Sequence, residues 1–145
     1  MSVDPRMLGW LSRALTHELG ALQQYLAQSA LARLWGDTAL ADALRHEALE
    51  ELAHAERLME RLIVLGRAPA AGSLAPARLG RDAQALWDAD RQLEIDAVLL
   101  YREALAHAQR VRDGDSAALL HELLQAEAAH LQGIDRHLGE ASRHD

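Results

Sequence analysis

Apolar residues recur at intervals of three and four along most of this chain, the spacing that places them on one face of an α-helix. Breaks in this pattern are few. The first helix-start signal is Asp4-Pro5, an N-cap residue followed by a proline at the first helical position. The spacing therefore predicts four long helices. They run from Pro5 to Trp35, from about Asp37 to Leu65, from about Arg81 to Arg112, and from the turn at 113–116 to about Leu138.

The segment from Gly66 to Gly80 lacks this spacing and holds three of the nine glycines and two of the three prolines. The turns at 36–38 and 113–116 are short, so each joins two antiparallel neighbours. A loop as long as 66–80 can cross the length of a bundle, which allows the second and third helices to run parallel. We predict an all-α, four-helix bundle of two antiparallel hairpins joined by one long crossover, forming a single domain over residues 1–145.

Composition excludes several classes of protein. Half of the residues are hydrophobic, mostly Ala and Leu with no Phe, which favours helices over strands. The absence of cysteine removes disulfides, thiolate zinc sites and iron–sulfur clusters. A net charge of −7 argues against nucleic-acid binding. The sequence shows neither a secretory signal pattern nor an apolar run of roughly 18 residues, so we expect a soluble cytoplasmic protein that does not enter a membrane.

The sequence Glu-x-x-His occurs in the second and in the fourth predicted helix, and each copy follows a lone glutamate by 33 residues. A Glu and a His three residues apart lie on one face of a helix, so both can reach one metal ion. The repeated order indicates two related helical hairpins. Its six residues are Glu18, Glu51, His54, Glu94, Glu127 and His130.

All four glutamates interrupt apolar stripes, where burying an uncompensated carboxylate costs several kcal/mol. The chain has no lysine, and no arginine lies on these stripes. Two divalent cations would balance four carboxylates and two neutral imidazoles, and such ligands suit iron or manganese. This is the dinuclear carboxylate pattern of ferritin-like bundles. The alternative is that these are protonated or salt-bridged interior acids, with the histidines hydrogen-bonded in the core.

Along nearly its whole length the sequence resembles the bacterioferritins. The resemblance rests on the six residues above, on the stretch 46–57, and on the helix break at 66–69. It implies a ferroxidase di-iron centre in which Glu51 and Glu127 bridge the two irons. Glu18 with His54, and Glu94 with His130, would be the terminal ligands.

The resemblance also bears on three residues beside the six. Tyr25 corresponds to a tyrosine close to the di-iron centre, and the alternative is a core aromatic residue. His46 and Glu50 correspond to an iron site on the inner surface of a protein shell, although a solvated helix face would look the same. We expect the remaining histidines at positions 17, 107, 137 and 144 to lie on the surface.

The sequence departs from this family at three points. Leu52 stands at the position of the methionine that ligates haem between two subunits, so haem is not expected there. Gly133 stands where some members have a tryptophan implicated in electron donation. The sequence ends 15 residues after His130, so we expect no short fifth helix.

The expected function is oxidation of Fe(II) to Fe(III) by O₂ or peroxide, for iron storage and detoxification. The alternative is a di-iron oxidase or peroxidase of the rubrerythrin type without mineral storage, although the chain lacks cysteines for a rubredoxin-type donor. We expect a homodimer at least, with a closed shell of 12 or 24 subunits as the larger alternative. The first two helices would form the dimer through apolar residues beyond the core, which are Trp10, Leu31, Leu34, Trp35 and Met59.

Overall fold

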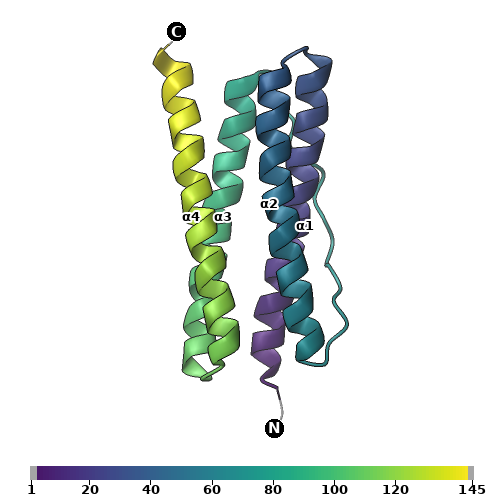
Figure 1. Cartoon of the computed structure of the whole chain (residues 1–145), viewed down its shortest axis with the longest axis vertical. Helices are drawn as coiled ribbons and strands as arrows, with labels where there is room; N and C mark the ends of the chain where they lie inside the picture. Colours follow the sequence, from purple (N-terminus) through teal and green to yellow (C-terminus); the bar gives the residue numbers. More distant parts are fainter. Residues whose placement is uncertain (1–2, 144–145) are drawn as a thin grey trace.

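In the computed structural model, residues 3–143 are described, and they form four helices that pack side by side (Figure 1). This confirms the predicted all-α bundle, and no strand occurs in this part of the chain. No helix within 3–143 is long and apolar enough to cross a membrane. His144 lies outside the described residues. The helices are α1 (Pro5–Leu34), α2 (Thr38–Val64), α3 (Ala83–Arg110) and α4 (Gly114–Arg143).

Aspartates begin three of the helices, as N-cap residues do when they accept hydrogen bonds from free backbone N–H groups. Asp37 accepts from the backbone N–H of Leu40, and Asp82 accepts from that of Ala85 in the same way. The fourth helix continues five residues past the predicted end at Leu138, because a glycine in a helix costs only about 1 kcal/mol and does not by itself end it.

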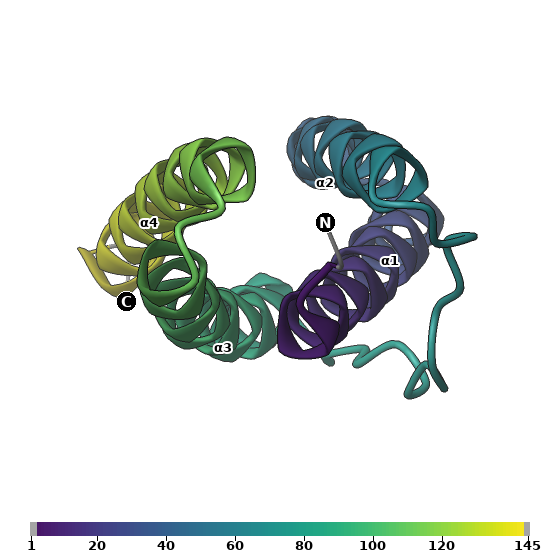
Figure 2. The same ribbon diagram turned by 90° about the horizontal axis from the view of Figure 1, so that it is seen from below.

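The crossover determines how the two hairpins are arranged. In Figure 1, α1 rises from the N-terminus and α2 descends, and the crossover then returns upward along the outer side of α1. Consequently α3 runs parallel to α2. Hydrogen bonds attach the crossover to α1: the Gly72 N–H donates to Thr16 Oγ1 at 2.8 Å, and Gln28 Nε2 donates to the Arg78 carbonyl at 2.9 Å. Figure 2 shows α1 beside α3, whereas α2 and α4 make few contacts with each other.

The core consists of two apolar clusters, one toward each end of the bundle. Leu11, Leu58 and Leu123 belong to the first cluster, and Leu44 and Trp87 belong to the second. On every helix, residues of one cluster precede the glutamate of the repeated motif and residues of the other cluster follow it. The packing therefore creates a layer of buried polar side chains between two apolar regions.

Candidate metal centre

The six residues of the repeated motif meet in this polar layer. Glu18 comes from α1 and Glu94 from α3, and α2 and α4 each supply one Glu-x-x-His pair. The four glutamates are fully buried or nearly so, His130 is buried, and His54 is half-buried. The sequence repeat therefore corresponds to one shared site.

Potential ligand atoms within this site form two groups that overlap. Inside each group, one ligand atom from every residue lies within 4.8 Å of the others. Glu51 and Glu127 belong to both groups, which is the arrangement expected of carboxylates that bridge two ions. The first group is Glu18, Glu51, His54 and Glu127, and the second is Glu51, Glu94, Glu127 and His130.

The Nδ1 atoms of both histidines point into the layer. His54 Nδ1 lies 2.8 Å from Glu127 Oε1 and 3.7 Å from Glu18 Oε2. His130 Nδ1 lies 3.0 Å from Glu51 Oε1 and 3.8 Å from Glu94 Oε1. The two rings are stacked with their centroids 5.9 Å apart. Each imidazole thus faces its own terminal glutamate and one shared glutamate.

Many of these atoms have the environment expected of metal ligands rather than of hydrogen-bonded core groups. Among the described residues, the buried atoms Glu18 Oε2, Glu94 Oε2, Glu127 Oε2 and both oxygens of Glu51 find no hydrogen-bond partner. The same is true of His130 Nδ1, although Glu51 Oε1 is only 3.0 Å away. Buried polar atoms in proteins are normally satisfied. The donor set of carboxylate oxygens and imidazole nitrogens fits iron or manganese.

The electrostatics of the site show a need for positive charge. Burial raises the pKa of Glu51 and Glu94 well above the usual range, and neighbouring carboxyl groups raise it further. Burial alone lowers the pKa of His54, but hydrogen bonds to Glu127 and Glu18 outweigh it and raise the pKa to about 9. In the absence of metal, protons on these groups therefore provide part of the compensation that divalent cations would supply.

Two tyrosines donate hydrogen bonds to the terminal glutamates. The Tyr25 hydroxyl donates to Glu94 Oε1 at 2.7 Å, so Tyr25 is both a core residue and a neighbour of the site. The Tyr101 hydroxyl donates to Glu18 Oε1 at 2.6 Å. The sequence analysis missed Tyr101. It follows Tyr25 by 76 residues, the same separation as Glu94 from Glu18, and this repeat could have identified it.

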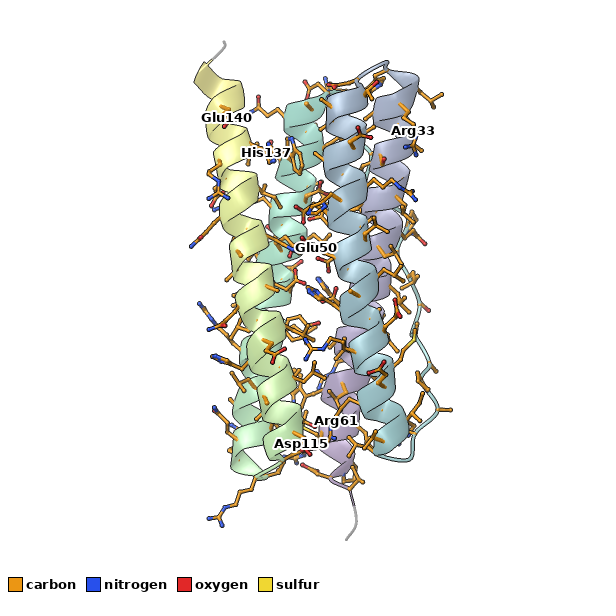
Figure 3. The ribbon with its side chains drawn as sticks, viewed as in Figure 1. Arg33, Glu50, Arg61, Asp115, His137 and Glu140 are labelled. Carbon is orange, nitrogen blue, oxygen red and sulfur yellow. The ribbon has the colours of Figure 1, made fainter. Side chains whose placement is uncertain are left out.

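A further cluster lies next to the six residues on the side of α2 and α4. His46 is exposed, and its Nε2 lies 3.0 Å from Glu50 Oε1. The other oxygen of Glu50 contacts His130 Nε2, and Glu47 Oε2 lies 3.5 Å from the same nitrogen. Figure 3 shows Glu50 at mid-height of the bundle, between α2 and α4. The predicted pair His46 and Glu50 is therefore in contact with the central site through His130, and Glu47, which was not predicted, joins it.

Another buried carboxyl group, Asp90, lies one helical turn before Glu94. Gln24 Nε2 donates to Asp90 Oδ1 at 2.9 Å, whereas Oδ2 has no hydrogen-bond partner within residues 3–143. Burial raises the pKa of Asp90 to about 7. The residue 76 positions earlier is Ala14, so this carboxyl group has no counterpart in the other half. The pseudo-symmetry of the site ends here.

We expect Asp90 to make the stability of the metal-free protein depend on pH. The native state keeps a proton on Asp90 that the unfolded chain loses near pH 4, so the free energy of unfolding falls as pH rises from about 4 to about 7. This one carboxyl can account for up to about 4 kcal/mol. Asp90→Asn should therefore be more stable than the wild type at about pH 8 and close to it at about pH 4, in urea unfolding followed by circular dichroism. An equal difference at both pH values would contradict this.

One expected surface histidine is buried. His107 is only 5% exposed, and its Nε2 lies 2.6 Å from Oδ2 of Asp4, so the prediction for His107 was wrong. The Asp4 carboxylate compensates the buried imidazole, and the two lie too far apart in the sequence for the pattern to show this. His137 is exposed as predicted, and its ring stacks on Trp87 with centroids 4.3 Å apart. His17 is half-buried.

The apolar residues predicted on the outer face of the first two helices divide into two sets. Leu34 and Trp35 are exposed as expected. Trp10, Leu31 and Met59 are instead half-buried and pack against the core clusters, so the expectation that they add exposed apolar surface was wrong. Sequence spacing gives the face of a helix but leaves its rotation in the bundle uncertain by a residue or two.

Comparison with known proteins agrees with the fold and with the repeated motif. The sequence model of the ferritin-like domain matches residues 9–144. The bacterioferritin of Brucella melitensis is 33% identical over 138 residues, which are 95% of this chain and 86% of that protein. A bacterioferritin of Rhodobacter capsulatus is 31% identical over 135 residues, 93% of this chain and 84% of that protein.

Bundle, crossover and repeated Glu-x-x-His motif together define a protein with a ferritin-like domain. The chain belongs to the bacterioferritin family, which confirms the resemblance found in the sequence.

Proposed function

We propose that this protein is a ferroxidase of the bacterioferritin type that oxidises Fe(II) for iron storage and detoxification. Each chain would bind two Fe(II) ions as substrate, roughly 3.5–4 Å apart, the usual separation in two-metal sites. The observation that carries the proposal is the pair of overlapping ligand groups that share Glu51 and Glu127. Glu18 with His54, and Glu94 with His130, would complete the two positions.

The chemistry requires two electrons and two protons. Each Fe(II) gives up one electron, and O₂ with two protons becomes hydrogen peroxide, or peroxide with two protons becomes two waters. The carboxylates neutralise the charge of both the Fe(II) and the Fe(III) states. His54 must lose its proton to act as a ligand, and because its pKa is raised to about 9, iron binding releases protons into the site.

Stoichiometry tests this proposal. Anaerobic protein loaded with Fe(II) and then exposed to O₂ should oxidise two irons per chain in a rapid phase, followed by absorption at near-ultraviolet wavelengths. Continued addition should build particles that hold hundreds of irons, as shown by iron analysis after size exclusion with light scattering. Saturation at two irons per chain without further uptake would favour the alternative oxidase or peroxidase. No rapid phase at all would refute the proposal.

We propose an isologous dimer through the outer face of α1 and α2 as the minimum assembly, with a closed 12- or 24-subunit shell as the larger one. Leu49 is 49% exposed on this face and Leu52 is 39% exposed, with exposed Leu26 on α1. Adjacent exposed leucines of this kind mark an interaction surface. The proposal includes no haem at position 52, because the side chain of leucine has no atom that ligates iron.

The double variant Leu49→Glu/Leu52→Glu should separate the dimer, because it places four carboxylates in a self-complementary apolar interface. Light scattering should report a fall to about 16 kDa, the mass of one chain. Leu99→Glu is the matched control, since Leu99 is a leucine on α3 that is 54% exposed. A stable wild-type monomer at micromolar concentration would contradict both the dimer and the storage function.

A further inference from the structure

Two tyrosine hydroxyls enter the polar layer from opposite sides. Tyr25 lies on α1 within one apolar cluster, and its hydroxyl reaches across to Glu94 on α3. Tyr101 lies on α3 within the other cluster, and its hydroxyl reaches back to Glu18 on α1. Both side chains are fully buried. The two contacts are therefore equivalent under the pseudo-two-fold relation of the hairpins, and each one connects the two hairpins.

These hydrogen bonds occupy one oxygen of each terminal carboxylate and leave the other available. Tyr101 donates to Oε1 of Glu18, while Oε2 is buried and lacks a hydrogen-bond partner in the described part of the chain. Glu94 has the same arrangement, with Oε1 bonded to Tyr25. Glu51 differs, because neither of its oxygens has a hydrogen bond among residues 3–143. A carboxylate with one oxygen committed can offer one ligand atom, whereas a carboxylate with two available oxygens can bridge.

Tyr101 is well suited to remain a hydrogen-bond donor. Burial raises the pKa of its hydroxyl well above the usual range, and the negative charge of Glu18 raises it further. The neutral hydroxyl has one proton to donate, and Glu18 Oε1 accepts it. A residue that orients a ligand in this way affects metal affinity without touching the metal.

We propose that Tyr101 is a positioning residue that holds Glu18 as a one-oxygen ligand at the metal position beside His54. Tyr25 would do the same for Glu94 at the position beside His130. This inference rests on the proposed function of the six residues as a two-metal site. It adds that each metal position depends on its own tyrosine, and that the tyrosine comes from the hairpin opposite to the glutamate it orients.

The variant Tyr101→Phe removes the hydroxyl and keeps the ring in the core. Glu18 then loses its only printed donor partner, and Oε1 becomes a second buried oxygen without a fixed orientation. We expect the metal position beside His54 to lose about 10- to 100-fold in affinity, the usual range when a residue that supports a ligand is removed. The position beside His130 should keep its affinity. Tyr25→Phe should have the reciprocal effect.

Co(II) is a suitable probe because it binds the same ligand types and can be located by anomalous scattering in crystals. Crystals of full-length wild-type protein soaked with limiting Co(II) should show similar occupancy at both positions. In Tyr101→Phe the occupancy should shift toward the position beside His130, and in Tyr25→Phe toward the position beside His54. Calorimetric titration in solution should give one tight and one weakened site for each variant.

A purely structural role gives a different result. Ser29→Ala removes another buried hydrogen bond of α1, from Ser29 Oγ to the Ala41 carbonyl, and should lower stability without changing the ratio of the two occupancies. The proposal is overturned if Tyr101→Phe binds Co(II) like the wild type or weakens both positions equally. If the wild type itself binds fewer than two Co(II) ions at the six residues, the proposed function fails, and this inference fails with it.

Discussion

Replacing Glu127 with glutamine should abolish rapid Fe(II) oxidation while the bundle stays folded. Glu127 belongs to both ligand groups, so the substitution removes a charged ligand from both metal positions at once. We expect the rate to fall by about 100-fold or more, beyond the 10- to 100-fold typical of residues that only support a ligand. Stopped-flow absorption after mixing with O₂ measures the rate, and circular dichroism measures the helix content.

Glu51→Gln should have the same effect, because Glu51 is the other residue shared by both groups. Glu122→Gln is the matched control on α4. Glu122 is exposed and pairs with Arg57 at 2.7 Å, outside the site, so its removal should leave the rate unchanged. Wild-type oxidation in either Glu51→Gln or Glu127→Gln would refute the assignment of these residues as shared ligands.

Removing metal should strongly lower the thermal stability of the protein. Four buried carboxylates with oxygens that lack hydrogen bonds among the described residues destabilise the metal-free state, and ions that bind only the native state stabilise it by mass action. At a free metal concentration of about 1,000 times Kd, each site contributes about 4 kcal/mol, or about 8 kcal/mol for two. For a chain of this size this corresponds to roughly 15–30 °C in Tm.

Calorimetry in Co(II) and in chelator measures this difference. The shift should grow as pH rises from about 6 toward 9, because the metal displaces the proton of His54, whose pKa is raised to about 9. A double variant with Glu51→Gln and Glu127→Gln is the control and should lose most of the shift. An equal shift in that variant would mean that the stabilising ions bind elsewhere.

The helices and the six residues of the site could be predicted from the sequence because their signals are local. Helical spacing, aspartate caps and the glycine-rich segment define the elements, and a Glu and a His three residues apart must share a face. The common offset then joins the two halves. These signals depend on neighbours within one or two helical turns, and the bundle preserves them.

Residues whose role depends on contacts between distant segments could not be predicted in this way. His107 appears polar and is placed near the end of a helix, yet it is buried because Asp4 lies beside it. Glu47 differs little from the other acids of α2 until the structure places it near His130. Tyr101 is the intermediate case, because the repeat contained the signal and only its partner, Glu18, gives it a meaning.

Each hairpin supplies one terminal glutamate and one Glu-x-x-His motif, and this division has a mechanical consequence. A slide of one hairpin along the other by a single helical turn, about 5.4 Å, would separate both ligand groups. Bound ions would therefore lock the axial register of the two halves, which the flexible crossover alone does not fix. Metal occupancy in this protein is thus also a gauge of whether its two halves are correctly aligned.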